Sequence, residues 1–165
     1  MGLDMYLSAR KHFEKVNWHT LQANDELTYN SPEAVYPKFN DLMEITQLTD
    51  VATDMYGAEV LVTCAYWRKA NQIHSWFVRE VQNGNDNCGD YYVSQDKLTE
   101  LKVICEHALE TKDPSLLPPQ GGFFFGSTDI DEWYWKDLTN TITQLERIFA
   151  LPEVDKLSFY YSSSW

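Results

Sequence analysis

Hydrophobic and polar residues alternate near both ends of the chain, a pattern typical of half-buried β-strands. Residues 3–8 alternate Leu, Met and Leu with Asp, Tyr and Ser, which predicts a first strand. Residues 157–161 alternate in the same way and predict a final strand at an edge of the sheet. Two apolar segments predict further strands: residues 58–65, which contain β-branched residues, and residues 122–126, which have glycine at both ends.

Between these segments, hydrophobic residues recur with the period of amphipathic α-helices. The first predicted helix runs from about residue 67 to residue 82. The second has Ser94 as its N-cap and runs to about residue 110. The third begins after a cap at Thr128 or Asp129 and stops before Pro152. The predicted apolar faces are Tyr66, Ala70, Ile73, Phe77 and Val81; Leu98, Leu101, Cys105 and Ala108; and Tyr134, Leu138, Ile142, Leu145 and Phe149.

The order of these elements indicates an α+β fold with a small, mainly antiparallel sheet packed against about three helices. A length of 165 residues fits a single domain, residues 1–165. Residues 24–59 form an acidic excursion from this fold, because eight acidic residues and one lysine give the segment a charge of −7. Pro32 and Pro37 interrupt regular structure there, and a short helix is predicted within residues 37–48.

The chain as a whole is acidic and rich in aromatic residues. Its formal net charge is −12, and its 13 Lys and Arg residues are spread along the chain, which argues against direct binding to nucleic acid. It has no apolar run of about 18 residues and no secretion signal at its start, so we expect no membrane span. Three cysteines without paired spacing predict reduced thiols in a cytoplasmic protein. Aromatic residues make up 15% of the chain, so some are expected to line a groove or an interface.

The segment 66–80 is the clearest candidate site, because it combines four aromatic and three basic residues within an acidic chain. On the predicted helix, Trp67, Asn71 and His74 share one face. Stacking, positive charge and directional hydrogen bonds from this segment fit an anionic or nucleotide-like ligand. The predicted ligand-binding residues are Tyr66, Trp67, Arg68, Lys69, Asn71 and His74, with Tyr91 or Tyr92 from the following loop.

The same segment also fits an ordinary amphipathic helix, in which Trp67 and Trp76 pack against the sheet and His74 is satisfied locally. In either case Asn71 and His74 need hydrogen-bond partners on an otherwise apolar face. The Gly-Ser-Thr-Asp segment at 126–129 fits helix capping better than anion binding, because the acidic residues around it would repel an anion. No catalytic, cofactor or metal-binding motif is found, and we expect no cofactor.

Three segments, residues 1–7, 66–78 and 117–132, resemble a family of small proteins found in bacteriophages and prophages. Members of this family begin with GLDMYL, carry YWRKANxIHxWFV and end with LLPxxxGFFFGxT. Some of them are labelled phosphoglycerate kinase. The length of this chain and the absence of a nucleotide-binding loop give that label no support. The resemblance implies a phage accessory protein without established activity, acting in the cytoplasm of a bacterial host.

Two non-catalytic functions are open. In the first, the protein binds a small anionic or nucleotide-like ligand without catalysis, as a means of countering a host defence. In the second, the acidic segment occupies the basic groove of a host nucleic-acid-binding protein. The residues expected to contact that partner are Asp41, Glu44, Asp50 and Asp54.

A third possibility is a small hydrolase or transferase. It would use His74 as a general base, and Asp4 or Asp129 would have to lie within hydrogen-bond reach of its ring. The sequence leaves the oligomeric state open.

Overall fold

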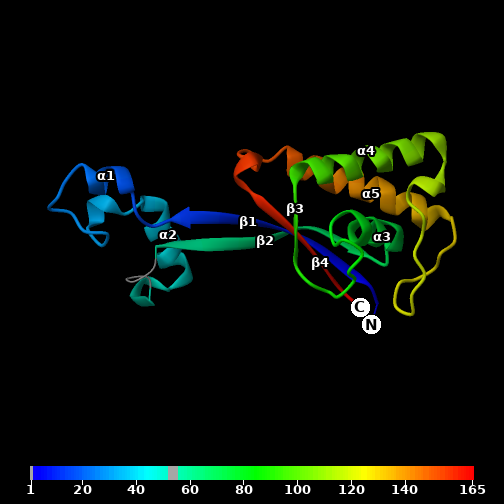
Figure 1. Ribbon diagram of the computed structural model, residues 1–165, viewed down its shortest axis with the longest axis horizontal. Helices are drawn as coiled ribbons and strands as arrows, with labels where there is room; N and C mark the ends of the chain where they lie inside the picture. The colour runs from blue at the N-terminus through cyan, green and yellow to red at the C-terminus, as the bar shows by residue number, and fades with distance from the viewer. Residues whose placement is uncertain (1, 52–55) are drawn as a thin grey trace. The chain divides into compact units, whose positions relative to one another are not determined.

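A computed structural model describes residues 2–51 and 56–165 of the chain (Figure 1). The chain forms two compact units. The larger unit comprises Met1–Arg10 and Val62–Trp165, and the smaller unit comprises Lys11–Leu61. The acidic excursion expected at residues 24–59 lies within the smaller unit, whose bounds are wider.

The strands form one four-stranded antiparallel sheet in the order β2-β1-β4-β3, so the expected α+β fold class is confirmed. The strands are β1 (Asp4–Glu14), β2 (Gly57–Arg68), β3 (Tyr91–Val93) and β4 (Ser158–Ser164). Strand β4 lies between β1 and β3, so the expectation that it is an edge strand was wrong. The short strand β3 was not predicted, and its three residues explain why no alternation was visible.

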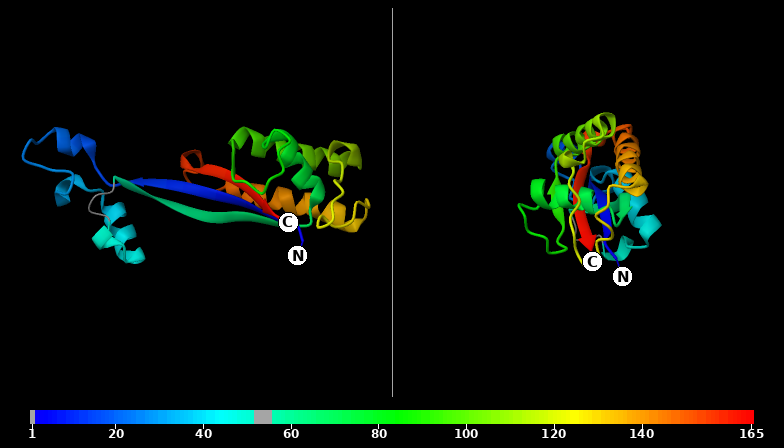
Figure 2. Two further views of the ribbon diagram at one scale, coloured as in Figure 1. Left: turned by 60° about the horizontal axis from the view of Figure 1, so that its bottom comes forward. Right: turned by 90° about the vertical axis from the view of Figure 1, so that its right-hand side faces the viewer.

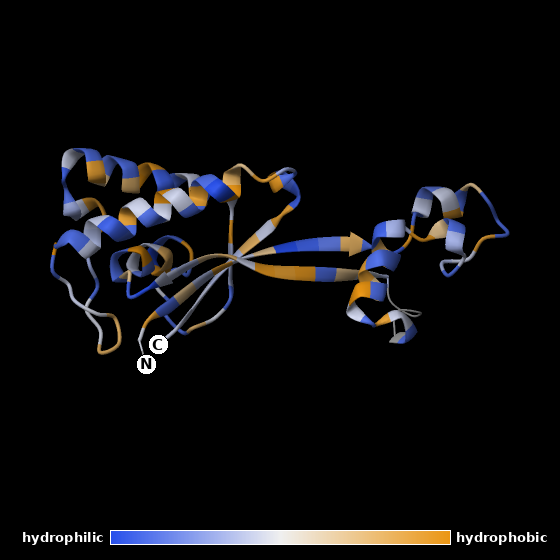
Figure 3. Ribbon diagram, turned by 180° about the vertical axis from the view of Figure 1, so that it is seen from behind, coloured by the Kyte–Doolittle hydropathy of each residue, from blue (hydrophilic) through white to orange (hydrophobic). Residues whose placement is uncertain are grey.

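Three helices cover the buried face of the sheet in the larger unit: α3 (Asn71–Glu80), α4 (Gln95–Thr111) and α5 (Glu132–Phe149). Helices α4 and α5 pack side by side (Figure 1 and Figure 2). Each carries hydrophilic and hydrophobic residues along its whole length, as Figure 3 shows, which is the expected composition of helices with one buried face.

The boundary between β2 and α3 differs from the prediction. Tyr66 and Trp67 belong to the strand rather than to the helix. The strand ends at Arg68, because Lys69 adopts the left-handed conformation with φ of 59° and turns the chain. The predicted helical face that joined Tyr66 to residues of α3 therefore does not exist as one face.

The cap of α5 also differs. Its N-cap is Asp131, whose Oδ1 accepts hydrogen bonds from the amides of Trp133 and Tyr134 at 2.9 and 3.1 Å. The expected cap at Thr128 or Asp129 was wrong by two or three residues. By contrast, the predicted cap of α4 is confirmed, because the Ser94 hydroxyl accepts from the amide of Lys97.

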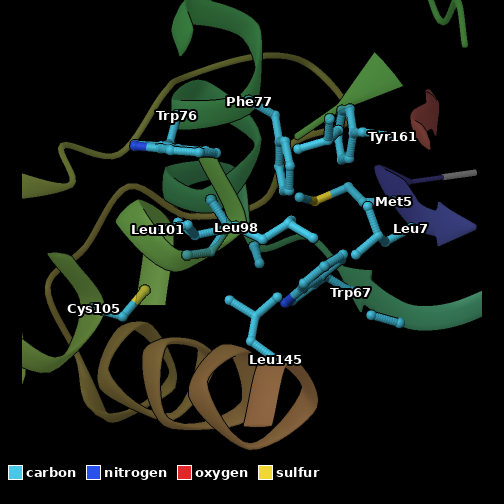
Figure 4. Close-up of a cluster of buried hydrophobic side chains, with 14 of the residues drawn as sticks. Met5, Leu7, Trp67, Trp76, Phe77, Leu98, Leu101, Cys105, Leu145 and Tyr161 are labelled. Atoms are coloured by element: carbon cyan, nitrogen blue, oxygen red, sulfur yellow. The ribbon is translucent and has the colours of Figure 1, made fainter. Parts of the chain in front are cut away.

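A contiguous hydrophobic core joins the sheet to the three helices (Figure 4). Trp67 is 2% exposed and lies among side chains of β1, α4 and α5. Phe77 of α3 stacks on Tyr161 of β4, with ring centroids 3.9 Å apart and planes 8° from parallel. The predicted core residues of α4 are all buried, as are Tyr134, Leu138 and Leu145 of α5.

The segment 122–126 forms turns instead of the predicted strand. Gly126 has a φ of +90°, and the exposed fraction of Phe123 is 96%, so the segment is neither extended nor buried throughout. Its backbone is nevertheless held in place, because the amide of Leu3 donates to the carbonyl of Phe124 at 2.9 Å.

The smaller unit contains α1 (Trp18–Gln22) and α2 (Pro37–Thr46), and α2 confirms the short helix predicted within residues 37–48. Phe39 and Met43 of α2 form the centre of a small hydrophobic cluster of its own. Single turns of 3-10 helix occur at Pro32–Ala34, Thr49–Val51, Pro114–Leu116 and Val154–Lys156.

Candidate functional site

A pocket of about 320 Å³ opens in the larger unit where β2 ends and where α3 and α5 begin. Pockets of this size are typical of small-molecule sites, at the lower end of their range. Its wall combines cations, carboxylates, an amide and a large aromatic ring. The lining residues are Arg68, Lys69, Asn71, Gln72, Pro119, Gly126, Ser127, Asp129, Asp131, Trp133, Tyr134 and Asp137.

Two cations, Arg68 and Lys69, line the pocket at the end of β2. Both are exposed, and neither forms an ion pair with any residue in the described part of the chain. The stem of Lys69 passes close to two glycines: a Cβ added to Gly2 would lie 3.1 Å from its Cε, and one added to Gly126 would lie 3.3 Å from its Cβ. The glycines thus leave room for the lysine at the pocket.

Asn71 positions the loop that forms the next part of the wall. Its Nδ2 donates to the carbonyls of Phe125 and Ser127 at 3.1 and 2.8 Å, and its Oδ1 accepts from the amide of Gln120 at 3.1 Å. The side chain is 2% exposed, and both of its amide hydrogens and its oxygen form hydrogen bonds. Asn71 therefore has a structural role at the pocket, because its side chain holds residues 120–127 in place.

A carboxylate and an amide meet between α3 and α5. Gln72 is 3% exposed, and its Nε2 donates to the carbonyl of Tyr134 and to Oδ2 of Asp137 at 3.4 and 3.2 Å. Burial raises the pKa of Asp137 from 3.8 to about 6, and the hydrogen bond from Gln72 opposes that rise. A carboxyl group with a perturbed pKa in a pocket is a common property of functional sites.

The remaining acidic residues belong to the loop before α5 and to its N-cap. The side chain of Asp129 accepts from the hydroxyl of Ser127 at 2.8 Å, and Asp131 caps the helix through one of its oxygens. Beside them the indole of Trp133 is 60% exposed, and Lys136 Nζ lies 4.8 Å from its ring centroid. The ring offers a flat surface on which a planar group can stack.

Trp67 and His74, two of the predicted ligand-binding residues, lie in the interior instead of at the pocket. The indole Nε1 of Trp67 donates to the hydroxyl of Thr141 at 2.9 Å. The ring nitrogens of His74 contact the Tyr161 hydroxyl at 2.7 Å and Asp86 Oδ2 at 3.0 Å. Because a carboxylate only accepts, Nε2 of His74 carries a proton and donates to Asp86.

The surroundings of His74 do not match the predicted hydrolase or transferase. Its ring is fully buried, and its two hydrogen-bond partners come from β4 and from the loop after α3. Asp4 is bonded to the Tyr66 hydroxyl and Asp129 to a serine, so neither carboxylate is hydrogen-bonded to His74. Burial also raises the pKa of the Tyr161 hydroxyl well above its usual range, so this hydroxyl stays protonated.

The three predicted tyrosines lie on the sheet, away from the lining of the pocket. Tyr66 and Tyr92 are 42% and 60% exposed on the face opposite the helices. Tyr92 packs edge-to-face on Tyr160, with ring centroids 5.8 Å apart. Tyr91 points the other way, and its hydroxyl bonds to the side chains of Asn85 and Asn87 at 3.1 and 2.9 Å.

Of the predicted residues, the structure thus brings Arg68, Lys69 and Asn71 together at the pocket. The sequence-based prediction missed Gln72, Trp133 and Asp137. Trp133 and Asp137 are four residues apart on one side of a helix, a spacing visible in the sequence, but nothing there indicated that this side faces the start of α3.

In the smaller unit, the predicted partner-binding residues Asp41, Glu44 and Asp50 are exposed. Asp54 lies outside the described residues. Ile45, next to Glu44 on α2, is 80% exposed, so an apolar side chain accompanies the acidic ones.

Within residues 2–51 and 56–165, no group of three or more His, Cys, Asp and Glu side chains is arranged to hold a metal ion. No helix in that part of the chain has the length and apolar character needed to cross a membrane. Comparisons with models of protein families, with curated proteins and with solved structures gave no match for this chain.

Proposed function

We propose that the protein binds a small anionic, nucleotide-like ligand in the pocket at the start of α3 and α5, and that it acts by binding rather than by catalysis. The observation that carries this proposal is the pair of cations, Arg68 and Lys69, which line a pocket without ion-pair partners in the described part of the chain. Asp129, Asp131 and Asp137 also line the pocket, so we expect the anionic group of the ligand to lie at Arg68 and Lys69, away from these carboxylates.

The other lining residues support a ligand with a planar part. Trp133 supplies a stacking surface, and Arg68 supplies a planar cation suited to phosphate or carboxylate. The loop at residues 120–127 is held by Asn71 before any ligand arrives, so the binding site is largely preformed. The resemblance to phage and prophage proteins adds a context to the proposal: binding of a host nucleotide in the bacterial cytoplasm to counter a defence.

The test is a thermal-shift screen of the full chain against mononucleotides, dinucleotides and cyclic nucleotides at millimolar concentration. A ligand present at 100 times its Kd adds about 2.7 kcal/mol to the free energy of unfolding, which shifts the midpoint by several degrees. The variant Arg68→Gln is expected to weaken binding about tenfold or more, since it removes a charge-assisted contact.

A matched control is Arg147→Gln, which removes an exposed arginine of α5 that does not line the pocket. This control should bind as the unmodified protein does. The proposal is refuted if no nucleotide shifts the midpoint, or if both arginine variants lose affinity equally.

A second candidate function is an interaction between the smaller unit and a basic partner protein. The observation that favours it is the exposed side of α2, where Asp41, Glu44 and Ile45 lie three and four residues apart. Acidic residues around an exposed apolar side chain fit a basic groove with an apolar floor.

This candidate is tested by pull-down from bacterial lysate at increasing ionic strength, with Ile45→Ser and the pair Asp41→Asn and Glu44→Gln as variants. The captured protein should be released by salt and lost with the charge-neutralising pair. Capture that is insensitive to salt and unaffected by these variants would rule out this use of the acidic surface.

A further inference from the structure

We infer that the pocket selects a ligand whose planar part presents two neighbouring hydrogen-bond donors, and that guanine nucleotides are the class that meets this requirement. This inference rests on the proposed binding function. It is carried by the orientation of the Gln72 amide and by the unused oxygens of Asp137 and Asp131.

The orientation of Gln72 is fixed by its neighbours. The Tyr134 carbonyl and the Asp137 carboxylate are both acceptors, so the NH₂ group of Gln72 must face them. Both amide hydrogens are thereby used. The oxygen Oε1 remains as an acceptor on a residue that lines the pocket, and a rotated amide is excluded because it would set oxygen against oxygen.

Two carboxylates add further acceptors. Gln72 occupies Oδ2 of Asp137, and no described residue donates to its Oδ1. The helix-capping bonds of Asp131 both go to its Oδ1, which leaves its Oδ2 without a donor from any described residue. Three residues that line the pocket thus each keep an oxygen that can accept from a ligand: Gln72 Oε1, Asp137 Oδ1 and Asp131 Oδ2.

Acceptors of this kind discriminate between planar groups by their hydrogen-bond edges. Guanine presents the N1–H and N2–H donors side by side, so both can meet acceptors. Adenine presents an N6–H donor next to the N1 acceptor, and the latter would face an oxygen. Buried polar groups left unpaired by the wrong ligand account for strong discrimination in such sites.

The rest of the pocket fits the rest of a guanine mononucleotide. Trp133 provides the stacking surface for the base, and Arg68 and Lys69 provide charge for a phosphate. A volume of about 320 Å³ suits a single mononucleotide better than a larger ligand.

The test measures the affinity of the full chain for four 5′-monophosphates, GMP, IMP, AMP and XMP, by titration calorimetry at pH 7.5. These ligands share ribose and phosphate and differ only at the edge of the base. IMP lacks the N2 amino group, and XMP carries a carbonyl oxygen in its place. We expect GMP to bind about tenfold or more tightly than IMP, AMP or XMP, since each of the others loses a hydrogen bond to the acceptors.

The decisive variant is Asp137→Asn. Its side-chain oxygen can still accept from Gln72, and its NH₂ group then replaces Oδ1 as a donor toward the pocket. The variant should lose affinity for GMP about tenfold and gain affinity for XMP, whose C2 carbonyl accepts. A residue with only a structural role would not reverse the order of two ligands. Asp155→Asn, at an exposed residue outside the pocket, is the matched control.

The outcomes separate this inference from the binding function on which it rests. If all four nucleotides bind equally and Arg68→Gln weakens each of them, the pocket is an anion site and guanine selection is refuted. Tighter binding of AMP, or an unchanged preference in Asp137→Asn, also refutes it. If none of the four binds, and the wider nucleotide screen is also negative, the inference and the proposed function both fail.

Discussion

Replacing Asp137 with asparagine should make the protein more stable at neutral pH. The carboxyl group has its pKa raised from 3.8 to about 6 by burial, so its charged form is less favourable in the folded protein than in the unfolded chain. The folded protein binds the proton more tightly, and the free energy of unfolding therefore falls as the pH rises through the window between about 4 and 6. Above that window Asp137 is charged in the folded protein, and the full free-energy cost of burying the charge is present. Asparagine has the same shape without the charge, so it removes this cost.

The size of the effect follows from the shift in pKa. A shift of about two units corresponds to about 3 kcal/mol at 1.36 kcal/mol per unit. Because the side chain is only partly buried, solvent screening reduces this value, and we expect about 1–1.5 kcal/mol. The asparagine side chain in the Asp137→Asn variant would keep the hydrogen bond from Gln72, since an amide oxygen also accepts.

Urea unfolding of Asp137→Asn and of the unmodified protein at pH 7.5 and pH 3.5 measures this difference. The variant should be more stable at pH 7.5 and nearly equal to the unmodified protein at pH 3.5, where Asp137 is already protonated. Asp155→Asn serves as the control at an exposed residue. A variant that is destabilised at both pH values would show that the carboxylate is stabilising, contrary to the burial described here.

Two further substitutions and one labelling experiment test other parts of the structure. Thr141→Val leaves the indole N–H of Trp67 buried without an acceptor and should cost about 1–3 kcal/mol in urea unfolding, with a shifted tryptophan emission. Asn71→Ala removes three hydrogen bonds and should cost about 2–3 kcal/mol, with faster hydrogen exchange at residues 120–127 than elsewhere in the larger unit. Cys88 is exposed, whereas burial raises the pKa of the Cys64 thiol to about 11 and that of the Cys105 thiol to about 12. A thiol reagent at pH 8 should therefore label Cys88 rapidly and the other two cysteines slowly. Rapid labelling of all three would contradict the burial of Cys64 and Cys105.

The sequence predicted the fold class because the core helices are long and strongly periodic. Helices α4 and α5 repeat their apolar residues over 17 and 18 residues, which leaves little ambiguity. The prediction failed at Trp67, since residues 65–68 fit both the period of a helix and the alternation of a strand. The left-handed turn at Lys69 decides between them, and lysine is not a residue type that indicates such a turn.

The candidate site was predicted in part for a related reason. Arg68, Lys69 and Asn71 are close in sequence, so local charge and polarity were sufficient to identify them. The hydrogen bond between Gln72 and Asp137 joins residues 65 positions apart. Such a pair depends on how α3 packs against α5, and the sequence pattern of either helix alone contains no information about it.

The ends of the segment between β1 and β2 lie close together, and this has a consequence for removing the segment. The amide of Lys15 donates to the carbonyl of Tyr56 at 2.9 Å, so the chain leaves β1 and returns to β2 at hydrogen-bond distance. The 42 residues from Lys15 to Tyr56 lie between two neighbouring antiparallel strands, as the loop of a hairpin does. A two-residue Asn-Gly turn could bridge the same strands. One deletion would thus remove the acidic residues of α2, such as Asp41 and Glu44, and the shortened protein would keep the pocket.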